Sequence, residues 1–158
     1  MATRSRIAVR VSQGMAIFGK DVKAGQVIHI YSHWDGYPDA KIPTLTKSYN
    51  TEEKAIALII QGNISSLSDS CEKPEGHTFE NPTEGYTTYY GRDRGEFDQE
   101  FEIGNWEEAR NQEEFGYLFE DGKWTWTDSY YKTIKEKEDE LEKYGETMSF
   151  KDSFVEQV

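Results

Sequence analysis

The chain has 158 residues, a length that suits one domain with a substantial apolar core. Only 35% of the residues are hydrophobic, but 14% are aromatic, and this richness in large rings excludes a disordered chain. The net charge of −12 excludes the basic stripe of an extended duplex-binding protein. Residues 1–67 hold 8 Lys and Arg against 5 Asp and Glu, whereas residues 68–158 hold 10 against 25. The acidic half serves solubility in the simplest interpretation and imitates nucleic acid in the alternative.

The number of cysteines and the apolar content of the chain indicate the cellular compartment. Cys71 is the only cysteine, which excludes an intrachain disulfide and fits a reducing cytoplasm. No run of about 18 apolar residues occurs, and the N-terminus lacks the apolar core of a signal peptide. We expect a cytoplasmic protein without a membrane contact. We also expect no cofactor and no metal, because His29 and His33 have the spacing of a helical metal pair in a segment predicted as strand.

In the first half of the chain, apolar alternation predicts strands at 7–11 and 26–34, with residues 15–18 pairing back on the first. A short helix is predicted at 42–49, and the clearest helix covers 51–61. Asn50 is its expected N-cap, Glu53 takes the capping-box position and Gly62 the C′ position. The helix is apolar over most of its circumference, so we expect a sheet and a partner subunit to cover it.

In the second half, a polar loop at 68–84 precedes a strand at 86–90 and one or two helical turns at 107–114. Asp121-Gly122 is a strong hairpin signal between strands at 115–120 and 123–127. A charged helix is predicted at 130–144, followed by a mobile tail at 146–158. The fold class is α+β: a single domain over residues 1–145, with an antiparallel sheet, one core helix and the charged C-terminal helix.

The run at 31–38, Tyr-Ser-His-Trp-Asp-Gly-Tyr-Pro, gathers three aromatic rings, an imidazole and a carboxylate at a strand end. Aromatic faces beside hydrogen-bonding groups suit a flat heterocycle such as a nucleobase. The other interpretation is a structural corner, in which Trp34 joins the core while His33 and Asp35 bond the turn.

A second cluster follows the predicted strand at 86–90. Gly91-Arg92-Asp93-Arg94-Gly95-Glu96 places two guanidinium groups on a glycine-bounded turn, where Asp93 can orient one of them toward a phosphate. The alternative is a turn of exposed ion pairs that adds little stability. No nucleophile elbow and no phosphate-binding or dinucleotide fingerprint occurs, so the best enzymatic interpretation is His33 with Asp35 as an acid–base pair.

Several of these motifs together resemble a known family. They are Thr3-Arg4-Ser5, the 31–38 run, Gly62-Asn63-Ile64-Ser65-Ser66-Leu67, the 91–96 cluster, and Tyr117-Leu118-Phe119-x-x-Gly122-Lys123-Trp124. In this order they resemble a family of small cytoplasmic proteins common in tailed-phage genomes, most of which have no assigned function. The resemblance covers about residues 1–127. The segment at 14–25 is longer than the family's usual hairpin, and the charged C-terminal helix and tail are particular to this chain.

The resemblance implies a phage protein in the host cytoplasm. One class of small phage proteins counters host defence by sequestering cyclic nucleotide immune signals as oligomeric sponges, and the pairing of aromatic rings with arginines here is similar in kind. We therefore expect a non-enzymatic nucleotide-binding protein. The expected ligand contacts fall into three groups: Trp34, Tyr37 and Tyr90 for stacking, Arg92, Arg94 and Arg4 for phosphates with Asp93 as orienting group, and His33, Asp35 and Ser5 for base or ribose edges.

Two further expectations concern partners. The alternative function is an acidic inhibitor that imitates nucleic acid and occupies a host nucleic-acid-binding protein. In either case we expect a homo-oligomer, most simply a dimer, because the helix at 51–61 and the aromatic-rich hairpin at 117–126 present more apolar surface than one small sheet covers. The competing account is that the loop at 68–84 covers the helix.

Overall fold

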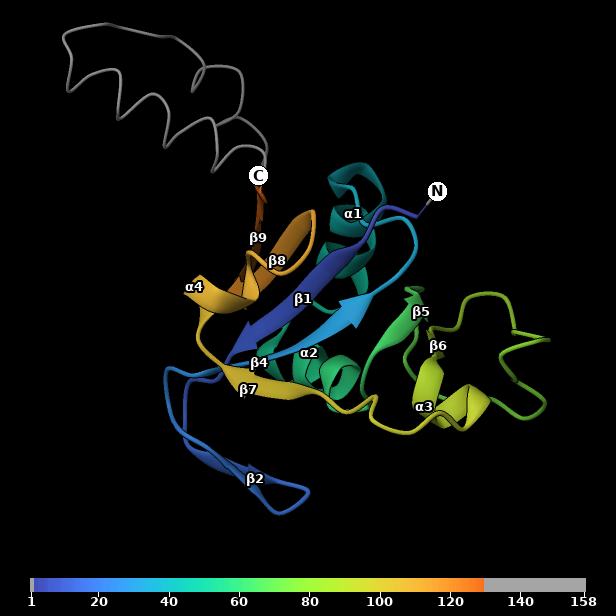
Figure 1. The fold of residues 1–158 in the computed structure, drawn as a ribbon, viewed down its shortest axis with the longest axis horizontal. Coiled ribbons are helices and arrows are strands. Elements are labelled where there is room, and N and C mark those ends of the chain that lie inside the picture. The colour runs from blue at the N-terminus through green and yellow to red at the C-terminus, as the bar shows by residue number, and fades with distance from the viewer. Residues whose placement is uncertain (1, 130–158) are drawn as a thin grey trace, which may run out of the picture.

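The computed structural model describes residues 2–129, drawn in colour in Figure 1. The predicted charged helix at 130–144 and the predicted tail at 146–158 lie outside the described residues. In chain order the elements are β1 (Ser5–Arg10), β2 (Met15–Ile17), β3 (Lys20–Val22), β4 (Val27–Ser32), α1 (Pro38–Ser48), α2 (Glu52–Ile59), β5 (Ile64–Ser66), β6 (Thr88–Tyr89), α3 (Tyr90–Arg94), β7 (Glu102–Gly104), α4 (Trp106–Ala109), β8 (Phe115–Glu120) and β9 (Lys123–Asp128).

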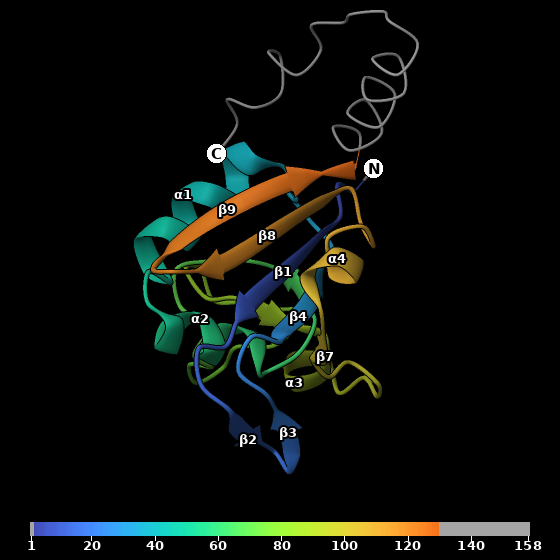
Figure 2. The same ribbon diagram turned by 90° about the vertical axis from the view of Figure 1, so that its left-hand side faces the viewer.

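Seven strands form one sheet in the order β6-β5-β4-β1-β8-β9, with β7 added to β4. The β1–β4, β4–β7, β5–β6 and β8–β9 pairs are antiparallel, and the β1–β8 and β4–β5 pairs are parallel. β4 has two partners on one edge, because β7 pairs with its first half and β5 with its end. In Figure 2, α1 and α2 lie on one side of the sheet and α4 on the other. The predicted α+β class with a mostly antiparallel sheet is confirmed.

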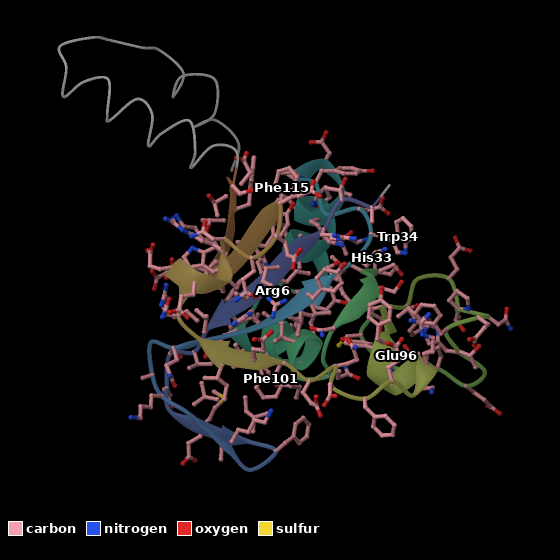
Figure 3. All side chains as sticks on the ribbon, in the orientation of Figure 1. Arg6, His33, Trp34, Glu96, Phe101 and Phe115 are labelled. Atoms are coloured by element: carbon pink, nitrogen blue, oxygen red, sulfur yellow. The ribbon has the colours of Figure 1, made fainter. Side chains whose placement is uncertain are left out.

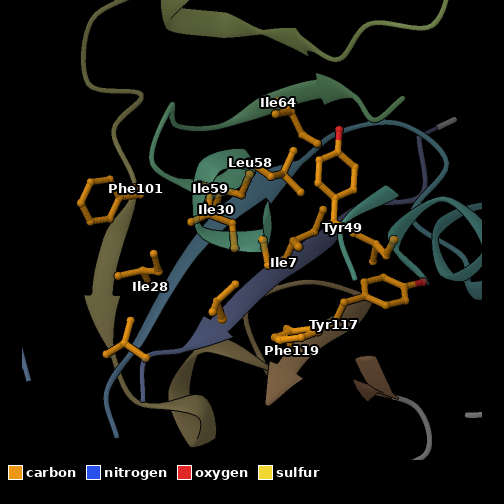
Figure 4. Close-up of a cluster of buried hydrophobic side chains, with 14 of the residues drawn as sticks. Ile7, Ile28, Ile30, Tyr49, Leu58, Ile59, Ile64, Phe101, Tyr117 and Phe119 are labelled. Carbon is orange, nitrogen blue, oxygen red and sulfur yellow. The ribbon is translucent and has the colours of Figure 1, made fainter. Parts of the chain in front are cut away.

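The main core lies between the sheet and α2. Side chains that alternate along β1, β4 and β8 point toward the helices and meet the inner face of α2, as Figure 4 shows for Ile7, Ile28, Ile30, Leu58, Ile59, Tyr117 and Phe119. All of these are fully or almost fully buried. Each stabilises the fold by roughly 1.5–3 kcal/mol relative to an exposed position. We call this side of the sheet the helix-covered face and the other side the open face.

The helix predicted at 51–61 is present as α2, but its cap differs from the prediction. The Thr51 side chain, not that of Asn50, accepts a hydrogen bond from the Lys54 amide at 3.1 Å. Gly62 has φ +100°, and a Cβ there would lie 2.3 Å from the Gln99 carbonyl oxygen, so only glycine fits. The outer apolar residues of α2 are partly buried against the same core. The helix therefore presents no apolar face that requires a partner subunit.

Other elements differ from the sequence expectation in extent or pairing. Residues 15–18 do not pair back on β1, because β2 and β3 form a separate two-stranded hairpin. α1 is longer than the predicted helix at 42–49, because Pro38 starts it in the first turn, where proline loses no hydrogen bond. The strand predicted at 86–90 is reduced to β6, and the helical turns predicted at 107–114 are confined to α4.

The hairpin predicted around Asp121-Gly122 is confirmed as β8–β9. Both turn residues have positive φ, 52° and 80°, as a tight two-residue turn requires. The aromatic residues of β9 are covered within the chain. The Trp124 indole donates to the Tyr49 carbonyl at 2.8 Å, and Trp126 packs against Phe115. This hairpin, like α2, gives no reason for a partner subunit.

Candidate functional site

The 31–38 run forms a corner at the end of β4. Backbone amides of His33 and Trp34 donate to the carbonyls of Ile64 and Ser65, at 3.2 and 3.0 Å, and so continue the ladder between β4 and β5. The rings of His33 and Trp34 meet edge to face with centroids 4.6 Å apart. Trp34 is still 46% exposed, so its ring is not part of the core.

The backbone of this corner is tied to the rest of the domain. Gly36 donates to the Thr3 carbonyl at 2.8 Å, and a Cβ at Gly36 would lie only 2.5 Å from that oxygen. The Gly36 carbonyl accepts the Tyr117 hydroxyl, and the Trp34 carbonyl accepts the buried Lys41 ammonium at 3.0 Å. The corner is therefore structural in its backbone, while its aromatic side chains remain exposed. The structural interpretation is wrong in placing Trp34 in the core, and the ligand-site interpretation stays a prediction.

Burial lowers the pKa of Lys41 to about 8, against the opposing effect of the Asp35 carboxylate. Asp35 has φ +53°, and its carboxylate accepts the Tyr37 hydroxyl at 3.3 Å. The Tyr37 side chain is 44% exposed. The corner thus presents two half-exposed rings and a carboxylate, with a lysine beneath them that the sequence did not point to.

The second cluster, predicted as a turn, is the short helix α3, and its two arginines have different surroundings. The guanidinium of Arg92 bonds only to protein oxygens: the Asp93 carboxylate, the Gln61 amide, and the carbonyls of Cys71 and Thr87, at 2.8 to 3.1 Å. These hydrogen bonds engage the N–H donors of the Arg92 guanidinium within the fold. Arg92 ties α3 to the polar loop at 68–85 and has no donor directed at an incoming phosphate.

Asp93 is the buried counterpart of Arg92. Its carboxylate accepts the Tyr89 amide at 2.8 Å and faces His77 Nε2 at 3.3 Å. Burial alone would raise the pKa of Asp93, but the Arg92 and Tyr89 hydrogen bonds together hold it below its ordinary value. His77 is buried as well, and its Nδ1 accepts the Thr83 amide at 2.9 Å. The sequence did not single out His77, because its carboxylate partner Asp93 is distant in the chain.

Arg94 lies on the outside of α3. Its guanidinium lies over the rings of Phe79 and Tyr90, 4.0 and 5.2 Å from their centroids, and pairs with Glu96. Its side chain is about two-fifths exposed. Arg94 and Tyr90 therefore form an accessible cationic and aromatic surface of the kind predicted, with Phe79 as an added member.

The strand register brings the ends of β4 and β6, and so the two clusters that follow them, close together. Ser32, Ile64 and Tyr89 are register partners across β4, β5 and β6, and all three are buried on the helix-covered face. Side chains alternate along strands, so Tyr31 points to the open face, whereas Tyr90 is the first residue of α3 and its ring packs against Phe79 with centroids 5.5 Å apart. Tyr31 and Tyr90 are two strand spacings apart, about 10 Å. Asn63 joins their backbones, since its side chain accepts the Tyr31 amide and its carbonyl the Tyr90 amide.

Tyr31 connects the corner at the end of β4 to the open face of the sheet. Its hydroxyl shares a hydrogen bond with His33 Nδ1 at 2.7 Å. Burial raises its pKa, an effect that nearby Arg4 opposes and that Glu113 and Tyr90 reinforce. Arg4 precedes β1 by one residue and is exposed. The antiparallel register places it opposite His33 on the open face.

A buried polar group that the sequence did not predict continues this face. Arg6 Nε donates to His29 Nδ1 at 2.9 Å, and its terminal nitrogen pairs with Glu102. Burial, with Arg6 beside the ring, lowers the pKa of His29 to about 4, so the imidazole is neutral at pH 7. The sequence feature that could have indicated this buried group is Arg6 itself. It alternates with apolar residues in β1, and this places an arginine on one face of the strand.

Ser5 does not join the open face. It is completely buried on the helix-covered face opposite Ser32, and neither Oγ has a hydrogen-bond partner among the described residues. It is out of reach of a ligand on the open face. His29 and His33 both point to the open face but are about 13 Å apart along β4. Within residues 2–129 no group of three His, Cys, Asp or Glu side chains is arranged for a metal ion.

Figure 3 shows His33 and Trp34 side by side at the end of β4, Arg6 near the middle of the sheet, and Glu96 beside α3. No helix within residues 2–129 is both long enough and apolar enough to cross a membrane. Comparisons of the chain with family models, with curated proteins and with solved structures each find no match.

Proposed function

We propose that this chain is a phage-encoded, non-enzymatic binding protein that sequesters a small nucleotide immune signal in the host cytoplasm. The ligand would lie across the open face, between the corner at the end of β4 and the outside of α3. The observation that carries the proposal is that Asn63 joins the backbones of Tyr31 and Tyr90, which puts the end of β4 and the start of α3 two strand spacings apart, about 10 Å. This span suits a ligand with two stacking groups and a phosphate between them.

The contacts available there determine the roles. Trp34, Tyr37 and Tyr90 offer rings on which a base can stack, and such a contact contributes about 1–3 kcal/mol. Arg94 has an exposed edge, and Arg4 is exposed beside Tyr31, so these two arginines would bind phosphate. Arg92 and Asp93 are assigned to the fold instead, because their polar atoms bond within the protein.

Polar side chains beside the rings would read the ligand's edges. His33 and Tyr31 share a hydrogen bond that a base can extend, and Asp35 offers a carboxylate to an amino group or a ribose hydroxyl. We propose binding and no turnover, because His33 bonds Tyr31 and Asp35 bonds Tyr37, so the two do not form the expected acid–base pair. The neutral His29 is engaged by Arg6, about 13 Å along the strand from His33. One phosphodiester cannot be reached from both imidazoles at that separation.

The test is calorimetric titration of the full chain with a panel of cyclic and linear nucleotides, followed by denaturation and recovery of the ligand. Binding with intact recovered nucleotide is expected. Trp34→Ala and Arg94→Gln should each weaken binding about tenfold. Lys123→Gln, at the β8–β9 turn, is the matched charge control and should leave binding unchanged. Binding of no nucleotide would refute the proposal, and recovery of a cleaved product would make the protein an enzyme.

A second candidate function is the acidic inhibitor of a host nucleic-acid-binding protein. It is favoured by a group of exposed carboxylates around β7 and α4, on Asp98, Glu100, Glu107, Glu108 and Glu114. A host protein captured through them should be basic and should dissociate steeply with added salt. The double variant Glu107→Gln with Glu108→Gln should weaken that capture and leave nucleotide binding unchanged. Salt-insensitive capture would contradict this candidate.

A further inference from the structure

A groove of about 580 Å³ lies between the β2–β3 hairpin and the segment at 95–101, and it borders α3 at Gly91. Its apolar lining comes from Ile60 at the end of α2 and from the buried ring of Phe101. In Figure 3, Phe101 lies beside β7 on the side of the sheet where the hairpin projects. A volume of this size accommodates several side chains of a partner.

Two exposed phenylalanines border this groove. Phe18 is 75% exposed on the hairpin, and Phe97 is 90% exposed on the opposite wall. Single exposed apolar residues are common and need no explanation. Two large rings beside one apolar groove are a different case, since together they form the kind of patch that marks an interaction surface.

Neither the turn nor the core accounts for Phe18. It has φ +50° and Gly19 has φ +79°, a two-residue hairpin turn in which Asn or Asp is the favoured first residue. The hairpin is attached to the domain through Ile17 and Val22, which are buried in the main core. Figures 1 and 2 show the hairpin projecting from the rest of the domain. A bulky apolar ring with positive φ at its tip contributes nothing to the isolated chain.

The charges on the two sides of the groove are complementary. The hairpin carries Lys20 and Lys23, and within residues 2–129 neither ammonium has a carboxylate in ion-pair range. The opposite wall carries Asp98 and Glu100, both exposed and likewise without an ion pair in the described part of the chain. A second copy of the hairpin would bring lysines to these carboxylates.

We propose that the groove binds the hairpin of a second copy of this chain in a two-fold dimer. Phe18 of each copy enters the groove of the other beside Phe97 and packs on Ile60, while Lys20 pairs with Glu100. Projecting ring and groove lie side by side on one patch, so each copy can offer both at once and the assembly closes at two subunits. The groove adjoins the nucleotide-binding surface at Glu96, the ion-pair partner of Arg94, but the dimer does not depend on the proposed function.

Light scattering during gel filtration tests the dimer. The full chain should give twice the 18.3 kDa of one chain at high micromolar concentration. Phe18→Ser should raise the dimer dissociation constant at least tenfold, since a central aromatic anchor dominates such interfaces. Tyr37→Ser is the matched control, because it removes an exposed ring at α1, at the other end of the molecule, and should leave the dimer intact. A monomeric wild-type chain, or a mass that grows beyond two copies, would overturn the proposal.

A charge exchange tests the orientation of the two copies. Lys20→Glu alone and Glu100→Lys alone should each weaken the dimer, because each puts like charges opposite one another. An equimolar mixture of the two variants should restore association as a heterodimer, in which both pairs again have opposite sign. Failure of the mixture to associate, with each variant folded by circular dichroism, would overturn the pairing of hairpin with groove.

Discussion

On the helix-covered face of the sheet, β1 and β4 present Ile7 and Ile30, whereas on the open face the same strands present Arg6 and Tyr31. β1 is buried from Ser5 to Val9, so exposure alone does not distinguish the two faces. The distinction is chemical: one face is filled by apolar side chains of α2, whereas the other combines a small apolar cluster of Ala8, Val27 and Leu118 under α4 with polar groups that pair with one another. A sheet can thus bury polar residues on a face that no long helix covers, provided that each finds a partner.

The largest expected effect comes from substituting two adjacent residues of β4 that lie on opposite faces of the sheet. Ile30→Ala should lower the free energy of unfolding by about 4 kcal/mol, because it leaves a cavity in a fully buried layer. Tyr31→Ala, one residue along β4, should cost about 1 kcal/mol, since a half-buried side chain loses fewer contacts. Urea denaturation followed by circular dichroism measures both. Equal losses would show that the open face is a second core layer.

The next largest effect concerns α3, which has a buried, hydrogen-bonded side and a side exposed to solvent. Asp93→Asn should cost about 3 kcal/mol, because it leaves the Arg92 guanidinium without its buried counter-charge. The exposed Asp98→Asn is the control and should change stability by less than about 0.5 kcal/mol. The pKa of Asp93 is lowered in the fold, so its contribution is present above the ordinary carboxyl pKa and is lost as pH falls. The variant should therefore lose less stability in acid than the wild type does.

The contrast between the faces also explains which parts were predictable from sequence. The α2 helix and the β8–β9 turn follow from local patterns, an apolar period and an Asp-Gly dipeptide, that need no knowledge of distant residues. The pairing of 15–18 was wrong, because the choice between β1 and β3 depends on where the hairpin packs and not on its own residues. The expected subunit contact on α2 stays a prediction, since the cover of the helix within the chain comes from non-local elements that its own residues do not reveal.

The candidate site shows the same limit. That Trp34 and Arg94 are accessible could be proposed from composition at a strand end. That Arg92 is a structural residue could not, because its partners Gln61 and Thr87 lie 31 and 5 residues away in sequence and are brought together by β5 and β6. Arg6 and Glu102 are 96 residues apart, and no pattern in a single sequence predicts such a pair.

A smaller, pH-dependent effect arises from the open face. His29 has its pKa lowered to about 4 by burial and by Arg6, whereas an unfolded histidine has a pKa near 6.5. Between these values the unfolded chain binds a proton that the folded chain does not, so stability falls as pH decreases from 6.5 to 4. We expect roughly 2 kcal/mol of this loss from His29. His29→Gln should flatten the dependence in urea titrations, whereas Tyr31→Phe should keep it. If His29→Gln leaves the dependence of stability on pH unchanged, the loss of stability comes from another group.

The smallest expected effect tests whether the corner at the end of β4 is a working surface or a structural one. Trp34→Ala should cost under about 1 kcal/mol of stability, because the ring is half-exposed and its main packing partner is the His33 ring. The bond from Lys41 goes to the Trp34 carbonyl, which the substitution leaves in place. Thermal denaturation with and without the best nucleotide separates the two roles: the variant should keep the melting temperature of the free protein and lose most of the ligand-induced rise. A large drop in the melting temperature of the free variant would mean that Trp34 supports the fold, and the open face would then lose its main stacking group.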